Sequence, residues 1–175
     1  IGSSARARAT TISNYAVSIG AHAGADNAST TGNTFGIAIG ANAGQHIKSG
    51  VRGLAIGQNA GQYVDGDNNA AIGVNAGRRV KGVGNAAYGD NAGSNLVGDN
   101  NIAIGKNANS VADGSTLTVS NTIALGPSAK AESYSNVAIG NTAAATAENA
   151  MALGANTKAG TANSVALGRY SETSD

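Results

Sequence analysis

The sequence contains no cysteine and no tryptophan, and only one proline, one methionine and one phenylalanine occur among its 175 residues. Without cysteine, neither a disulfide framework nor a cysteine metal site can form. Charged residues account for 12% of the chain and the formal net charge is +1, so the strong basic footprint of a nucleic-acid-binding protein is missing. No apolar run reaches the roughly 18 residues that a membrane-spanning helix requires. We therefore predict neither nucleic-acid binding nor direct membrane insertion by this chain.

Small residues dominate the composition of the sequence. Alanine, asparagine and the 26 glycines make up almost half of the chain. An ordinary globular domain has more large apolar side chains and about twice this charge, whereas a disordered tail lacks the regularly spaced valine, isoleucine and leucine found here. Collagen is excluded because glycine does not occupy every third position. This composition indicates an architecture built from internal repeats.

A four-residue apolar unit that ends in glycine recurs along the chain. Its copies are VSIG at 17–20, IAIG at 37–40, LAIG at 54–57, AAIG at 70–73, AAYG at 86–89, IAIG at 102–105, IALG at 123–126, VAIG at 137–140, MALG at 151–154 and VALG at 165–168. The spacing of the closing glycines defines 16-residue units between positions 57 and 105 and 14-residue units between positions 126 and 168. Because the pattern is already under way at residues 1–2, we interpret the chain as part of a longer protein.

Each unit predicts a short β-strand, because large, small and large residues alternate with a period of two. The glycine is expected to adopt a backbone angle that side chains forbid, and small residues further on, such as Ala129 and Ala131, predict a second strand. In the 16-residue units the second apolar site moves to Val64, Val80 and their equivalents. We predict that the bulky side chains meet in the interior and that the alanine column lets neighbouring chains approach closely. Asparagines before the strands, such as Asn85, are expected to bond their own turns.

Stacked coils of such units form an all-β solenoid, since one two-stranded unit cannot bury its apolar face alone. The repeat lengths favour a flat parallel β-roll with two strands per coil over a left-handed hexapeptide β-helix, which needs multiples of six residues. Calcium-binding nonapeptide rolls require Gly-Gly-x-Gly-x-Asp runs, and the sequence has none. Because one narrow roll buries little surface, we predict several chains packed side by side.

The segment Asn163-Ser164-Val165-Ala166-Leu167-Gly168-Arg169-Tyr170-Ser171 resembles the head repeat of trimeric autotransporter adhesins, the Yersinia adhesin-like head also called Hep/Hag repeats. The resemblance extends in phase from residue 1 to about residue 171. It implies a homotrimer of single-chain left-handed parallel β-rolls with 14–16-residue coils. It also implies a head domain over 1–171, the start of a connector to a neck and stalk at 172–175, and a place on the bacterial cell surface above an outer-membrane anchor.

The same resemblance implies adhesion by protein–protein contact, without catalysis or cofactor. The implied partners are host extracellular matrix proteins of the collagen or fibronectin class, host cells or other bacteria. Matrix binding in some members is attributed to Asn-Ser-Val-Ala-Ile-Gly-x-x-Ser units. One copy, with leucine in place of isoleucine, supplies the candidate binding residues Asn163, Ser164, Val165, Ala166, Leu167, Gly168 and Ser171. A structural spacer in a surface fibre or phage tail fibre is the alternative function.

A basic run is a second candidate contact site. Arg78, Arg79 and Lys81 form this run, and Lys48 and Arg52 lie two coils earlier. If the coils stack in register, these side chains come near each other on one side of the roll, where a sulfated glycan or an acidic partner could bind. The alternative interpretation is a solvated turn that keeps the roll soluble.

Two insertions interrupt the repeat, at residues 26–33 and 110–120. Loops on a rigid scaffold often carry function, and residues 116–119 within the second insertion could extend as a hairpin arm. The alternative is a tolerated surface insertion without a role in binding.

Catalytic and metal-binding patterns are missing. We predict no enzyme activity, no cofactor and no metal site, because His22 and His46 have no further ligands in a recognisable pattern and serine and threonine fall in turn columns. The run Gly82-x-Gly84-x-x-Ala87 mimics a dinucleotide-binding fingerprint, but it lacks the long preceding strand and the following helix that this site needs.

Overall fold

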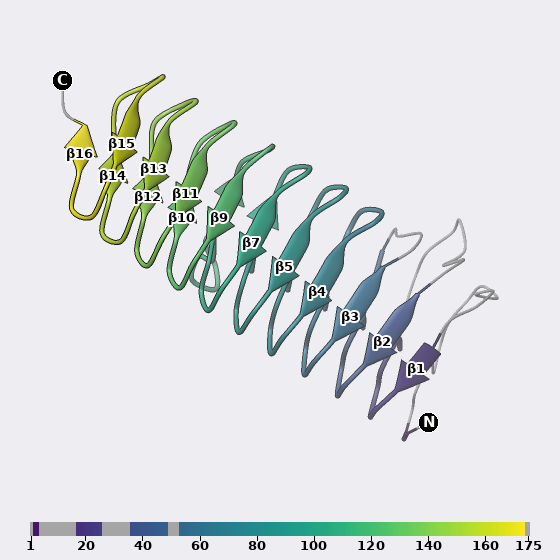
Figure 1. Ribbon diagram of the computed structural model, residues 1–175. Coiled ribbons are helices and arrows are strands. Elements are labelled where there is room, and N and C mark those ends of the chain that lie inside the picture. Colours follow the sequence, from purple (N-terminus) through teal and green to yellow (C-terminus); the bar gives the residue numbers. More distant parts are fainter. Residues whose placement is uncertain (1, 4–16, 26–35, 49–52, 174–175) are drawn as a thin grey trace.

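The computed structural model describes residues 2–3, 17–25, 36–48 and 53–173, which form strands and turns only. Successive coils stack into one solenoid that runs from the N-terminal to the C-terminal end of the chain (Figure 1). The predicted all-β parallel solenoid is therefore confirmed. The insertion at 26–33 and Arg52 of the predicted basic run lie outside the described residues.

One strand from every described coil contributes to a ten-stranded sheet, which we call the first sheet. Its strands are β1 (Val17–Ile19), β2 (Ile37–Ile39), β3 (Leu54–Ile56), β4 (Ala70–Ile72), β5 (Ala86–Tyr88), β7 (Ile102–Ile104), β9 (Ile123–Leu125), β11 (Val137–Ile139), β13 (Met151–Leu153) and β15 (Val165–Leu167). Every pairing is parallel and in register, so that Ala38 pairs with Ala55 and Ala55 with Ala71. The predicted repeat units are thus the rungs of the solenoid.

The opposite layer is a regular sheet only in the 14-residue coils. There β10 (Lys130–Ala131), β12 (Ala144–Ala145), β14 (Lys158–Ala159) and β16 (Glu172–Thr173) pair in parallel. In the longer coils before β9 this layer consists of the pair β6 (Leu96–Val97) and β8 (Leu117–Thr118), the latter within the 110–120 insertion, and of single bridges that join Asp65 to Lys81 and Lys81 to Val97. The sheet continues to Thr173, and a domain boundary after residue 171 stays a prediction.

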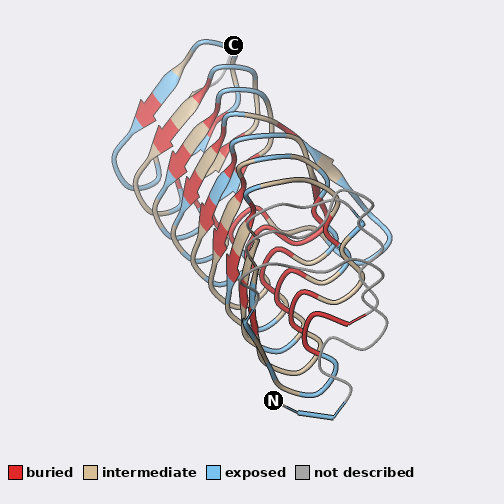
Figure 2. Ribbon diagram, turned by 90° about the vertical axis from the view of Figure 1, so that its right-hand side faces the viewer, coloured by how far each residue is buried: buried red, intermediate tan, exposed pale blue. Residues whose placement is uncertain are grey.

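The interior of the roll is made of alanine. The small middle residue of each strand from β2 onward is buried, as are Ala43, Ala60 and their equivalents after the glycine turn, and together they form one continuous cluster. Figure 2 shows these buried segments following one another from coil to coil. The large residues on either side of them face outward. The prediction that the bulky side chains meet inside, with alanine left for contacts between chains, is therefore wrong.

The narrowness of the coil explains this orientation. A methyl group added at Gly61 would lie 3.2 Å from the Cβ of Ala55 and 3.8 Å from that of Ala71. Protein interiors are packed without spare volume, so the space between the two layers is filled mostly by alanine methyl groups, with Thr157 as a larger buried residue among them. The period of two in the strands was interpreted correctly, but the small face is the one that fits inside.

The 16-residue coils contain a second core, smaller in extent but made of larger side chains, beside the alanine core. Val64, Val80, Leu96 and Val119 are buried there, with Ile47 and Leu117 packed against them. The two extra residues widen the far side of the coil, and the predicted second apolar site fills that space. The 14-residue coils have no counterpart of this cluster among the described residues.

The glycine that ends each unit permits the close stacking of coils. At Gly73 the backbone φ is +130°, and an added Cβ would lie 2.6 Å from the carbonyl oxygen of Gly89. The same short contact recurs between the equivalent glycines along the roll. The expected special backbone angle is confirmed, and the stacking distance adds a second reason why no side chain fits there.

Buried polar residues that directly precede strands of the first sheet link successive coils by hydrogen bonds. The Oδ1 atom of Asn85 accepts bonds from both the backbone and the side-chain nitrogen of Asn101, at 3.0 and 2.9 Å. Asn69 does the same for Asn85, and the amide and hydroxyl of Thr122 bond to Asn101. The expectation that such asparagines bond their own turns is wrong for Asn85 and Asn101, whose side chains link each coil to the next, whereas Asn69 also bonds the Gly66 carbonyl of its own turn.

Candidate functional site

The 110–120 loop folds back onto the predicted basic run. Asp113 in this loop accepts a hydrogen bond from Nη2 of Arg78, one of 2.8 Å from Nη1 of Arg79 and one of 3.3 Å from Nδ2 of Asn95. The bond from Arg78, followed by that from Asn95, holds the pKa of the Asp113 carboxyl below its usual value of 3.8. The two arginines thus have an acidic partner within the same chain.

The loop is held on both sides of Asp113. Before it, the carbonyl of Val111 accepts a 3.0 Å bond from the Asn95 side chain. After it, β8 pairs in parallel with β6, and Val119 is fully buried in the second core. Residues 116–119 therefore lie along the roll, and the hairpin arm expected for them is not formed.

The lysines of the predicted basic site lie at a different position within the coil from the arginines. Lys81 is exposed, and its backbone forms a parallel β-bridge with that of Asp65 on the preceding coil. Lys48 occupies the equivalent place one coil earlier still. The coil that carries Asp65 therefore separates the two lysines. In-register stacking brings Arg78 and Arg79 to one carboxylate, but it divides the other members of the expected basic patch.

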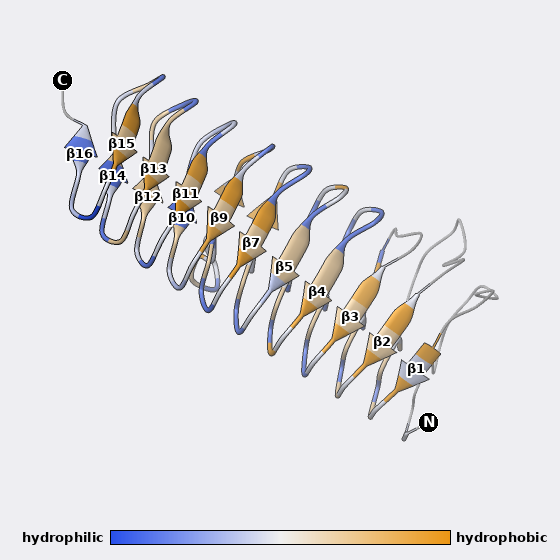
Figure 3. Cartoon of the chain, viewed as in Figure 1, coloured by the Kyte–Doolittle hydropathy of each residue, from blue (hydrophilic) through white to orange (hydrophobic). Residues whose placement is uncertain are grey.

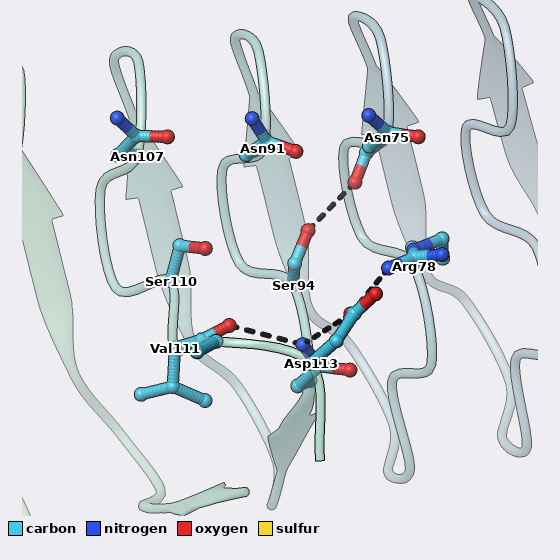
Figure 4. Close-up of a pocket in the computed structure, with 10 residues that line it drawn as sticks. Asn75, Arg78, Asn91, Ser94, Asn107, Ser110, Val111 and Asp113 are labelled. Atoms are coloured by element: carbon cyan, nitrogen blue, oxygen red, sulfur yellow. Dashed lines mark hydrogen bonds and ion pairs between the residues drawn. The ribbon is translucent and has the colours of Figure 1, made fainter. Parts of the chain in front are cut away.

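A polar hollow of about 430 Å³ opens beside this ion pair. Asn75, Asn91 and Asn107 occupy equivalent turns of three successive coils and lie in a row along it (Figure 4). Ser94 and Ser110 line it between the asparagines and the loop, and the Ser94 hydroxyl donates a 2.7 Å bond to the Asn75 carbonyl. The hollow thus offers mainly amide and hydroxyl groups, next to a pair of guanidinium groups.

The two histidines do not come together. The ring of His46 stacks on Tyr63 with 4.7 Å between centroids and 9° between planes, and His22 is exposed. No cluster of three or more potential metal ligands occurs in the described part of the chain. A search of the same residues for a helix long and apolar enough to cross a membrane also finds none.

The predicted matrix-binding unit forms the last described coil of the first sheet. Val165 and Leu167 project outward and are 59% and 72% exposed, whereas Ala166 between them is 3% exposed and belongs to the core. The hydroxyls of Ser164 and Ser171 each donate to a carbonyl oxygen of the same coil, at 2.5 and 2.6 Å. Of these residues Val165 and Leu167 are the exposed ones, and a role of the unit in binding stays a prediction.

Polar groups border this unit on both sides. Asn163 is exposed, and its Oδ1 accepts a 3.2 Å bond from Nδ2 of Asn149, the equivalent residue of the preceding coil. Gly168 ends the strand with a φ of +104°. Beyond it, the guanidinium of Arg169 lies 4.5 Å from the ring centroid of Tyr170, which is 64% exposed. The exposed polar and aromatic atoms of this coil thus lie at its turns.

An exposed apolar face was missed by the sequence analysis. Large aliphatic side chains point outward along the first sheet, and Figure 3 shows most of its strands in hydrophobic colours, with paler stretches in β1 and β5. Those with the greatest exposure are Val17, Ile19, Ile37, Ile72, Ile102, Leu125, Ile139, Val165 and Leu167. The alternation of large and small residues was the signal for this face, but alternation alone does not say which side points outward.

The family model of the YadA head domain repeat matches residues 120–143, 137–157 and 145–171. These ranges cover the 14-residue coils. Neither the curated proteins nor the solved structures give a match to the chain. The earlier coils continue the same first sheet in the same register. The chain therefore carries YadA head domain repeats over residues 120–171, which confirms the predicted resemblance to the heads of trimeric autotransporter adhesins.

Proposed function

We propose that this chain is the head of a homotrimeric adhesin on the bacterial cell surface, built from three left-handed β-rolls and carried by an outer-membrane anchor. Its partners would be host extracellular matrix proteins of the collagen or fibronectin class, or host cells, bound by protein–protein contact without catalysis. The family match supports this proposal, because YadA head repeats indicate an adhesin-type surface function.

The exposed apolar face is the main observation that supports assembly into a trimer. Monomeric proteins rarely expose a contiguous apolar patch larger than a few hundred Å², yet here outward aliphatic side chains follow the first sheet from β1 to β15. The alanine core contributes little burial per residue, since alanine has a small side chain. Three rolls that turn these faces toward a common axis would bury them.

Sedimentation of the purified chain and two aspartate variants tests the assembly. Ile139→Asp places a charge on the apolar face and is expected to shift the trimer toward monomer, because an unpaired charge is costly to bury. Ala144→Asp is the matched control, since Ala144 lies in β12 of the opposite layer and the trimer should persist. A wild-type chain that is a stable folded monomer at micromolar concentration would contradict the proposal.

Solid-phase binding of the assembled protein to a panel of matrix proteins tests the adhesive role. Asn163→Ala is expected to weaken binding, and Asn141→Ala, at an exposed asparagine two coils earlier, is the control. Equal binding by both variants and wild type would remove the 163–171 unit from the proposal. A trimer that binds neither matrix proteins, nor host cells, nor itself would favour the structural spacer.

A further inference from the structure

We propose that the hollow beside the 110–120 loop is a binding site for an acidic saccharide, whose carboxylate replaces that of Asp113 between Arg78 and Arg79. The site lies in the turns of the 16-residue coils and shares no residue with the 163–171 unit. It would add a carbohydrate ligand to a head proposed to bind proteins.

Asp113 shows what the two arginines can hold. Its Oδ1 receives nitrogen donors from Arg78, Arg79 and Asn95, although the Asp113 side chain itself is 60% exposed. Guanidinium groups bind carboxylates through directed, charge-assisted hydrogen bonds. The arrangement is therefore a carboxylate-binding site, occupied by a residue that is in contact with solvent.

The part of the loop that carries Asp113 can move without disturbing the roll. Residues 112–116 are exposed, and Gly114 has no atom within 4 Å of an added Cβ. Apart from the bonds that Asp113 accepts, the attachments of the loop named above lie outside this part, at Val111 and in β8. An incoming carboxylate can therefore displace Asp113 while the second core stays intact.

Arg78 supplies an additional reason to expect a ligand. Its Nε atom is buried and has no hydrogen-bond partner, which makes it an exception among the side chains of the described residues. A buried donor without an acceptor is costly. A ligand with more than one oxygen can satisfy both Nε and the terminal nitrogens of this guanidinium, which the single Oδ1 of Asp113 does not.

The remainder of the hollow fits sugar hydroxyls. Asn75, Asn91 and Asn107 repeat along it on adjacent coils, at the spacing of about 4.8 Å between neighbouring strands, and Ser94 and Ser110 add hydroxyl groups (Figure 4). Its volume of about 430 Å³ lies within the usual range for small-ligand sites. Amides and hydroxyls arranged in a row match a chain of hydroxyl-bearing rings better than an acidic peptide, which has few hydroxyls to bond.

Calorimetric titration of the assembled protein with a hyaluronan hexasaccharide, which carries glucuronate carboxylates, tests this proposal. Binding is expected for this probe and not for neutral chitohexaose. Asp113→Ala removes the internal competitor and should strengthen binding about tenfold, whereas Arg78→Ala and Arg79→Ala should each weaken it about tenfold, as expected for charge-assisted bonds. Arg169→Ala, an exposed arginine outside the hollow, should leave the affinity unchanged.

A second pair of variants examines the row of amides. Asn91→Ala should weaken saccharide binding, and Asn42→Ala, in the same column but away from the hollow, should not. Equal binding of the neutral sugar, tighter binding of hexaglutamate than of hyaluronan, or an Asp113→Ala variant without increased affinity would each overturn the proposal. Because the measurement is saccharide affinity and not attachment to matrix proteins, its result is independent of the proposed adhesive role.

Discussion

The 16-residue coils and the 14-residue coils share one half of their structure and differ in the other. In both regions the first sheet, the buried alanines and the stacked glycines repeat without interruption. On the opposite side, the longer coils hold a core of valine and leucine with few strand pairs, whereas the shorter coils form a regular sheet of two-residue strands. With two additional residues per coil, apolar packing thus replaces most of the backbone strand pairing on this side of the roll.

The 110–120 loop lies where the coil length changes. The coil after β9 has no residue in the second core, and the loop supplies its last members, Val119 and Leu117, of which Leu117 pairs with Leu96. The insertion therefore has a structural role in addition to the saccharide site proposed beside it. Without it the second core would expose large apolar side chains to water.

The largest expected effect tests what the two regions share. Gly89→Ala in the longer coils and Gly140→Ala in the shorter ones should each lower the free energy of unfolding by at least about 3 kcal/mol, because φ values near +130° are closed to side chains and the next glycine leaves no space for a Cβ. Denaturant unfolding measures both losses. Gly53→Ala, which lacks a positive φ and whose added Cβ would lie 3.9 Å from the Asn69 carbonyl oxygen, is the control, and a large effect in only one region would contradict a common stacking mechanism.

The buried asparagine column is expected to be more important in the longer coils. Asn101→Ala should cost about 3 kcal/mol, since it removes the buried side-chain bonds to Asn85, Val119 and Thr122. Asn136→Ala removes fewer bonds and should cost about 1 kcal/mol. Thermal unfolding of the two variants gives the comparison, and equal losses would show that the ladder does not distinguish the regions.

The second core can be tested with two valines of the same coil. Val80 is 2% exposed and Val83 is 42% exposed. Val80→Ala should lower the free energy of unfolding by about 2 kcal/mol through lost burial and the cavity that remains, and Val83→Ala, the control, by less than about 0.5 kcal/mol. Similar values in denaturant unfolding would mean that the second core contributes little.

The smallest expected effects come from exposed ion pairs, with opposite pH dependence in the two regions. The pKa of Asp113 is lowered, first by its bond from Arg78, so the stabilisation is complete above pH 3.8 and is lost as the pH falls through the lower value of the folded state. The pKa of Lys158 is raised by Glu172, so that stabilisation is complete below pH 10.5 and is lost as the pH rises through the higher folded-state value.

NMR titration of the two side chains measures both shifts. Glu172→Gln should return the Lys158 midpoint toward 10.5, because the carboxylate is the cause of the shift. A midpoint of Asp113 above 3.8, or of Lys158 below 10.5, would contradict these assignments.

The repeat allowed the strands, their parallel stacking and the special glycines to be predicted from sequence, because each of these features depends on local residue pattern. The direction of the bulky residues could not be deduced in this way. In Ile102–Ile104 the alternation defines two faces of the strand. Only the distance between the two layers decides that the face with Ala103 is the buried one. The asparagine column was missed for a related reason, since its partners lie in other coils.

The candidate sites were predicted less completely than the fold. Arg78 and Arg79 were identified, but their bonds to Asp113 join residues that lie far apart in the sequence. The 163–171 unit was found from its resemblance, while the outward position of Val165 and Leu167 became visible only in the stacked coils. Positions set by contacts between coils cannot be read from one coil.

The sequence by itself determined that the chain forms short strands at regular intervals, that glycine ends each of them and that the repeats over residues 120–171 are of the YadA head type. These properties follow from backbone preferences and from a periodic pattern, which act within one coil. The tertiary structure alone decided which face of the strands is buried, where the inserted residues go and which charged groups meet. These outcomes depend on the space left between two layers, and that space exists only after the coils have stacked.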